Sequence, residues 1–160
     1  SAQEQRLAKV ERYLDVPSAQ KGRTVSAAGI PKSQAASEDL ALYTQGKQAF
    51  DREDYAGARA AFESLLKKYP KSDQADNAQF WIGEIYYREK WYEKAILEYQ
   101  NVIEKYPKGN KAPAALLKQG LAFSNIGDTA NSKLILQELG RKYPNSNEAK
   151  VAAEKLKTMK

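Results

Sequence analysis

The chain has 160 residues, of which 42% are hydrophobic and 29% are charged, and this suits one folded domain with an appended segment. It contains neither cysteine nor histidine, which excludes disulfides, thiolate metal sites and catalytic triads that depend on histidine. The net charge of +6 is spread along the sequence, which argues against nucleic-acid binding, and no apolar stretch is long enough to span a bilayer.

The first 38 residues differ in composition from the rest of the chain. Leu7, Val10 and Leu14 have helical spacing, so residues 1–14 are expected to form a short helix. Two interpretations of this helix stay open: it is the end of a coiled coil, or it docks on the remaining chain. Residues 15–38 are rich in Pro, Gly, Ser, Ala and Gln, which predicts a flexible polar linker. The polar start of the chain shows no signal peptide, so an exported protein would be present here without that part of its precursor.

Residues 39–160 carry a repeat with a period of 37 residues. The tripeptide Lys-Tyr-Pro occurs three times, with its tyrosine at Tyr69, Tyr106 and Tyr143. Glycine recurs in the same register at Gly46, Gly83 and Gly120. A fixed period of this length indicates an array of stacked units, and such arrays usually act as binding surfaces. We expect repeats at about 39–72, 73–109 and 110–146, followed by a helix over 147–158 whose polar outer face caps the array.

Each unit is predicted to consist of a helix, a tight turn and a second helix. In the second unit, Ala78, Ile82 and Ile85 recur at helical spacing, and a second periodic run ends before Pro107. Asn110 is expected to cap the next helix, in register with Asp73 and Asn147. Gly83 and Ala95 carry almost no side chain, so the two helices of the unit are expected to meet there.

This pattern resembles the tetratricopeptide repeat, a helix-turn-helix unit. The residues that carry the resemblance in the second unit are Gly83, Tyr86, Ala95, Tyr99, Val102 and Pro107. The resemblance implies an all-α fold: a right-handed α-solenoid of three tetratricopeptide-like repeats plus a C-terminal capping helix.

Two runs, 75–87 and 105–118, are similar to a more specific family. They look like the C-terminal domain of the periplasmic Tol-Pal system proteins, the cell division coordinator (CpoB, formerly YbgF) family, over about residues 39–158. In that family an N-terminal coiled coil forms trimers and a polar linker joins it to the repeats. The resemblance therefore implies a homotrimer and an adaptor in the Gram-negative periplasm. The partners it implies are the envelope-spanning TolA-type protein and the peptidoglycan synthase machinery, so that outer-membrane constriction is coupled to septal peptidoglycan synthesis during cell division.

The first helices of stacked units line a concave face, where a peptide or helix of a partner is expected to bind. The protein-binding residues predicted on this face are Tyr43, Lys47, Phe50, Asn77, Phe80, Glu84, Tyr87, Arg88, Leu117, Leu121 and Ser124. For Tyr43, Phe80 and Leu117 a second interpretation is equally open, because the same register suits packing between neighbouring units.

Other function classes fit the sequence less well. No glycine-rich phosphate loop, metal-ligand cluster or nucleophile motif is present, so we expect no enzyme, cofactor or metal site. Neighbouring acidic residues such as Asp73 and Asp76 suit helix starts. An alternative function is a structural component of outer-membrane protein assembly, where a lipoprotein carries similar repeats. A cytosolic co-chaperone is disfavoured, because Glu84 and Leu121 stand where a carboxylate clamp needs polar or basic groups.

Overall fold

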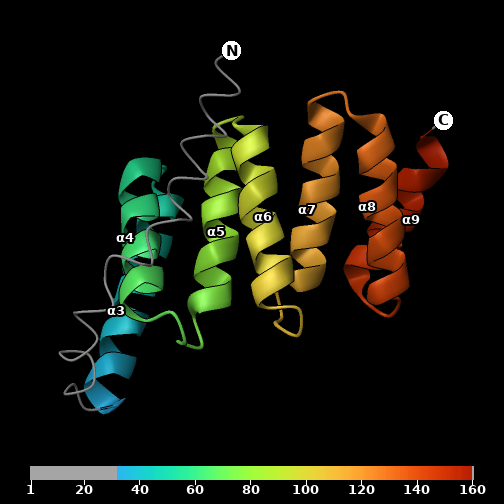
Figure 1. The fold of residues 1–160 in the computed structure, drawn as a ribbon. Helices are drawn as coiled ribbons and strands as arrows, with labels where there is room; N and C mark the ends of the chain where they lie inside the picture. Colours follow the sequence, from blue (N-terminus) through green and yellow to red (C-terminus); the bar gives the residue numbers. More distant parts are fainter. Residues whose placement is uncertain (1–31, 160) are drawn as a thin grey trace. The chain divides into compact units, whose positions relative to one another are not determined.

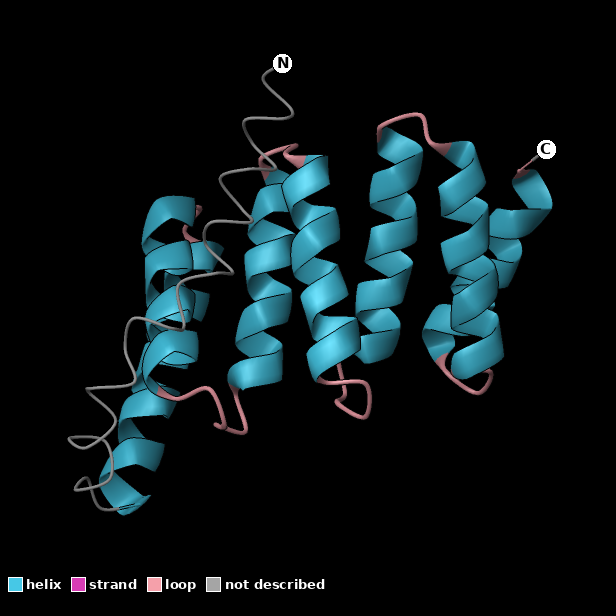
Figure 2. Cartoon of the chain, in the orientation of Figure 1, coloured by secondary structure: helices cyan, strands magenta, loops and turns pink. Residues whose placement is uncertain are grey.

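The structure is a computed structural model that describes residues 32–159, so the predictions for residues 1–14 and for the linker up to residue 31 lie outside the described residues. In the described part every regular element is an α-helix, which confirms the all-α class (Figures 1 and 2). The helices are α3 (Lys32–Asp51), α4 (Tyr55–Lys68), α5 (Ala75–Arg88), α6 (Tyr92–Lys105), α7 (Ala112–Asn125), α8 (Thr129–Lys142) and α9 (Asn147–Thr158). None of these helices is both long and apolar enough to cross a membrane.

The helix boundaries repeat with the period of the sequence. Helices α4, α6 and α8 begin at residues 55, 92 and 129 and each has 14 residues. Helices α5 and α7 also have 14 residues each, and begin at residues 75 and 112. The described chain is therefore a series of helix-turn-helix units with one further helix, α9, at its end.

The first helix starts earlier than the sequence led us to expect. Helix α3 begins at Lys32, so residues 32–38, predicted as part of the linker, are helical. This segment contains Gln34, Ala35 and Ala36, which favour a helix even without large apolar side chains. Pro31 directly precedes the helix in the sequence, and proline is well tolerated at helix starts.

The described residues divide into two compact units, with the boundary between Ala78 and Gln79. In the first unit α3 packs on α4. Phe62 and Leu65 of α4 are fully buried there, and the ring of Tyr43 lies 5.9 Å from that of Phe62. Gly46 gives Phe62 its space, because a Cβ atom at Gly46 would lie 2.6 Å from the Phe62 ring.

In the second unit α6 packs on α7, α7 on α8, and α9 on both α7 and α8. One buried cluster joins these helices, and it includes Tyr99, Val102, Leu116, Leu136 and Leu139. Ala149 and Ala152 of α9 close this cluster at the C-terminal end. The helix after the third repeat thus buries apolar surface that the last repeat would otherwise expose.

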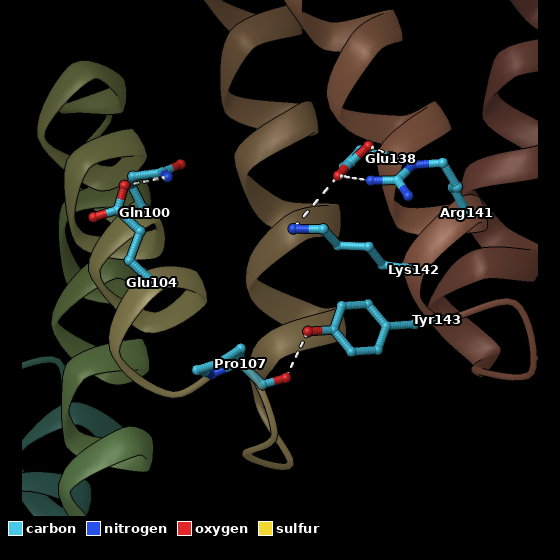
Figure 3. A network of polar contacts seen from close by, with 7 residues as sticks. All are labelled: Gln100, Glu104, Pro107, Glu138, Arg141, Lys142 and Tyr143. Atoms are coloured by element: carbon cyan, nitrogen blue, oxygen red, sulfur yellow. Dashed lines mark hydrogen bonds and ion pairs between the residues drawn. The ribbon is translucent and has the colours of Figure 1, made fainter.

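The Lys-Tyr-Pro tripeptides end the second helix of each repeat, as their position suggested. Tyr69, Tyr106 and Tyr143 are the C-cap residues of α4, α6 and α8, and each donates its backbone N–H to a carbonyl in the last turn. The proline that follows disfavours a helical backbone at the tyrosine and prevents continuation of the helix, and all three tyrosines have a non-helical backbone. The Tyr143 hydroxyl also donates to the Pro107 carbonyl at 2.6 Å, which ties the end of α8 to the preceding repeat's turn (Figure 3).

Exposed charged side chains near the end of α8 also pair with one another. Glu138 accepts a hydrogen bond from Arg141 Nε at 3.0 Å and lies 3.4 Å from Lys142 Nζ (Figure 3). The hydrogen bond from Arg141 holds the pKa of the Glu138 carboxyl below its usual value. Exposed pairs of this kind contribute little to stability because water screens them.

The caps of the first helices differ from those expected. Asn110 does not cap α7: the N-cap is Lys111, which makes no side-chain cap hydrogen bond, and Pro113 lies in the first turn. Asn147 is already inside α9, and Ser146 caps that helix by accepting from the Ala149 amide at 3.1 Å. Serine and asparagine are equally good N-cap residues, so the sequence alone did not decide whether Ser146 or Asn147 caps α9.

Candidate protein-binding face

In the first unit, the predicted residues of α3 make local contacts. Lys47 Nζ lies 3.8 Å from the Asp51 carboxylate and 5.3 Å from the centre of the Phe50 ring. Phe50 itself is only 9% exposed and packs edge-on against Tyr55. The polar end of Lys47 is therefore the more accessible group at this end of α3.

Asn77, near the start of α5, is partly buried, and its side chain makes one local hydrogen bond. Its side-chain amide donates to Gln74 Oε1 at 3.2 Å. Its carbonyl oxygen Oδ1 is buried and has no hydrogen-bond partner within the described part of the chain. A buried acceptor of this kind costs free energy unless a water or another group reaches it.

Phe80 lies in the core of the second unit. It is 6% exposed, and its ring lies 5.8 Å from the rings of both Trp81 and Tyr99. Lys111 Nζ lies 5.2 Å from the centre of the ring. Phe80 therefore packs in the core, which agrees with the second interpretation given above for this residue, packing rather than partner binding. Because Phe50 and Phe80 are both buried, we exclude them from the candidate face.

The structure brings Glu84 and Tyr87 of α5 together with Lys118 of α7. Lys118 Nζ lies 3.8 Å from Glu84 Oε1 and 4.0 Å from the centre of the Tyr87 ring. The side chains of Lys118 and Glu84 are 27% and 13% exposed, so both charges are partly withdrawn from water. An ammonium group above a tyrosine ring and beside a carboxylate is held by both, which fixes its position on the surface.

Asn125 completes this arrangement at the C-terminal end of α7. Its side-chain amide donates to the Tyr87 hydroxyl at 3.0 Å and to the Leu121 carbonyl at 2.9 Å. Burial raises the pKa of the Tyr87 hydroxyl, while the hydrogen bond from Asn125 acts in the opposite direction. Tyr87 is therefore neutral at ordinary pH, with its ring and hydroxyl both fixed.

The remaining predicted residues of the second unit differ in how far their side chains are exposed to solvent. Leu117 is half-buried and packs against the core cluster. Leu121 and Ser124 are half-buried, and Arg88 is exposed at the end of α5. We define the α5–α7 face as the set Glu84, Tyr87, Arg88, Lys118, Leu121, Ser124 and Asn125.

Sequence reasoning missed Lys118 as a member of this face, and it also missed the contacts of Lys111 beside it. Lys111, Lys118 and Asn125 follow one another at seven-residue intervals, so they lie along one side of α7. Lys111 Nζ lies over Phe80 and, at 5.7 Å, over Trp81, much as Lys118 lies over Tyr87. The seven-residue spacing of these polar residues was the signal in the sequence, but it does not say which α5 rings they meet.

The Glu84 carboxylate also connects the face to the core. Tyr99, which is fully buried, donates its hydroxyl to Glu84 Oε1 at 2.6 Å. Burial raises the pKa of Tyr99, and the nearby Glu84 raises it further, so the hydroxyl stays protonated and can donate.

Within residues 32–159 no group of three or more acidic side chains is placed to hold a metal ion.

The sequence and the fold can be compared with those of known proteins. The family described as YfiO, outer membrane lipoprotein, matches residues 35–160. The chain belongs to this family. In addition, 40 residues are 48% identical to the cell division coordinator CpoB of Pseudomonas putida. That match covers 23% of this chain and only 15% of the coordinator.

Solved structures of tetratricopeptide-repeat domains share the fold of this family member. The N-terminal domain of stress-induced protein-1 from C. elegans has a TM-score of 0.65 at 14% identity, over 75% of this chain and 95% of that one. The second tetratricopeptide-repeat domain of human RPAP3, determined with an HSP70 peptide, has a TM-score of 0.62 at 14% identity, over 78% and 98%. These likenesses confirm the helical-repeat fold expected from the sequence.

Proposed function

We propose that this chain is a non-catalytic, protein-binding adaptor of the Tol-Pal envelope system in the Gram-negative periplasm. In this role it links outer-membrane constriction with septal peptidoglycan synthesis during cell division. The observation that carries the proposal is the stretch of 48% identity to a cell division coordinator, in a chain whose fold is a tetratricopeptide-like array. The partners proposed are a TolA-type envelope-spanning protein and the peptidoglycan synthase machinery.

The α5–α7 face is the proposed binding surface within the second unit. Leu121 offers apolar surface, Tyr87 an aromatic ring, and Lys118 with Glu84 a fixed pair of opposite charges. Because these groups are already held by contacts with one another, binding a peptide or helix orders few further side chains. Tyrosine and arginine, both present on the face, often carry much of the binding energy at protein interfaces.

A second candidate is a structural role in outer-membrane protein assembly. The family match over residues 35–160 to an outer membrane lipoprotein favours it. Both candidates require a surface that binds other proteins, and they differ in the partner.

In-cell photocrosslinking distinguishes the two candidates. A photoreactive amino acid placed at Arg88, which is exposed beside the α5–α7 face, would be activated in dividing cells and the crosslinked proteins identified. Recovery of a TolA-type protein is the expected result. Recovery of outer-membrane assembly components without any Tol protein would favour the second candidate and contradict the first.

We also propose a homotrimer through an N-terminal coiled coil. Light scattering on a chain extended at its N-terminus tests this proposal, and a monomer mass would contradict it.

A further inference from the structure

The position before the second helix of each repeat is occupied by aspartate twice and by tryptophan once. Asp54 accepts a hydrogen bond from the Gly57 amide at 3.0 Å, and Asp128 accepts from the Asn131 amide at 3.1 Å. Trp91 stands midway, 37 residues from each, and α6 begins without a side-chain cap hydrogen bond. An aspartate stabilises a helix start and a large apolar residue does not, so the second repeat gives up local stability at this position.

Trp91 belongs to a partly exposed aromatic cluster at the short turn between α5 and α6. Lys94 Nζ lies 4.6 Å from the centre of the Trp91 ring and 5.2 Å from that of Tyr86. Beside them, Tyr92 packs edge-on against Tyr87 at 5.3 Å. We call Tyr86, Trp91, Tyr92 and Lys94 the Trp91 cluster. The centres of protein interfaces are enriched in Trp and Tyr, and three such side chains are partly exposed at this one turn.

The charge of this turn also differs from that of its two equivalents. Residues 88–94 hold three basic and two acidic side chains. Residues 51–57 hold one basic and three acidic side chains, and residues 125–131 hold a single acidic one. The turn that carries the aromatic cluster is therefore the one whose charge favours a negative partner.

We propose that the Trp91 cluster is a second protein-binding surface, and that it accepts an acidic segment of a partner protein carrying a large apolar side chain. The apolar side chain packs on the ring surface of Trp91 and Tyr86 that Lys94 leaves uncovered, and the acidic groups face Lys94 and the basic residues of the turn. Aspartate at position 91 would stabilise α6 but would remove the largest ring and repel the carboxylates. The proposal does not depend on the α5–α7 face or on a Tol protein as partner.

The test uses two labelled peptides and follows their binding by fluorescence anisotropy. One is Gly-Glu-Asp-Phe-Glu-Asp-Gly, and the other replaces each acidic residue with its amide. We expect the acidic peptide to bind at least about tenfold more tightly than the amide peptide, with an affinity that falls as salt is added. Trp91→Asp should weaken binding of the acidic peptide by at least about tenfold, and Trp91→Phe by much less.

Folding and binding are separated by the same variant. Trp91→Asp is expected to raise the urea midpoint of unfolding while it abolishes tight binding, so a loss cannot be attributed to misfolding. Lys155→Ala, which removes one exposed positive charge from α9, should leave binding of the acidic peptide unchanged. Equal affinity for the two peptides, no binding of the acidic peptide at millimolar concentration, or full binding by Trp91→Asp would overturn the proposal. Self-association that is lost in Trp91→Asp would also overturn it, by assigning the surface to a second copy of the chain.

Discussion

Gly83 of α5 lies directly against the ring of Tyr99 of α6, so that a Cβ atom at Gly83 would be 2.7 Å from Tyr99 Cε1. The third repeat has the same relationship between Gly120 and Leu136, also at 2.7 Å. The ring of Tyr99 is fully buried and hydrogen-bonded to Glu84, so it has little room to move aside. Glycine therefore recurs at Gly46, Gly83 and Gly120 because a large side chain of the second helix fills the space that a Cβ atom would occupy.

Gly83→Ala is expected to destabilise the fold by about 1–3 kcal/mol, because the new methyl group overpacks a buried ring. Gly140→Ala is the matched control: Gly140 lies within α8, is exposed, and a Cβ atom there would meet nothing within 4 Å. Alanine at that position should stabilise the helix by about 0.5–1 kcal/mol. Urea unfolding followed by circular dichroism measures both. Equal effects of the two substitutions would contradict the packing explanation.

Glu53 and Lys90 adopt a left-handed backbone, each with φ of 63°, and Gly127 occupies the equivalent position with φ of 82°. Lys90→Gly should therefore stabilise the chain by up to about 1 kcal/mol, since only glycine adopts this conformation without strain. Gly127→Ala should cost about 1–2 kcal/mol although no atom lies close to the new methyl group. Thermal unfolding of the two variants would show opposite shifts. A loss of stability in Lys90→Gly would show that the Lys90 side chain itself matters.

Trp91→Asp should increase the free energy of unfolding by about 1 kcal/mol, because the aspartate can accept from the Lys94 amide as Asp128 does from Asn131. Asp128→Ala is the reciprocal change and should cost about 1 kcal/mol. Chemical denaturation of both variants measures the pair. A destabilised Trp91→Asp protein would mean that Trp91 is held in place mainly for packing.

The sequence predicted the repeat and its helices because those features depend on spacing alone. It left two interpretations open for Phe80, since Phe80 and Tyr87 lie on the same side of α5 and only the contacts with α6 and α7 decide which is buried. It missed Lys118 for the same reason: the α5 ring that a lysine of α7 meets is set by how the helices pack. It placed the start of α3 too late, because alanine and glutamine suit a helix as well as a linker.

The Tyr69 hydroxyl donates a hydrogen bond to the Glu38 carboxylate, which raises the pKa of Tyr69 to about 12. The ordinary pKa of tyrosine is about 10, so this hydrogen bond is fully present below pH 10 and is lost as the pH rises toward 12. An alkaline titration of tyrosine resonances by NMR should show Tyr69 titrating late, and Glu38→Gln should bring its pKa back toward about 10. A wild-type Tyr69 that titrates with unperturbed tyrosines would contradict the contact. The pair is exposed, so we expect only a small effect on unfolding.

The most direct test of the proposed adaptor function is calorimetric titration of the chain with the purified periplasmic part of a TolA-type protein. Two charge-reversal variants are compared: Lys118→Glu on the α5–α7 face, and Lys155→Glu at an exposed position of α9. We predict that Lys118→Glu weakens binding by at least about tenfold, because it places a negative charge beside Glu84 and removes the cation above Tyr87. Lys155→Glu should bind as the wild type does. Undiminished binding by a folded Lys118→Glu protein, or no binding by the wild type, would contradict the account.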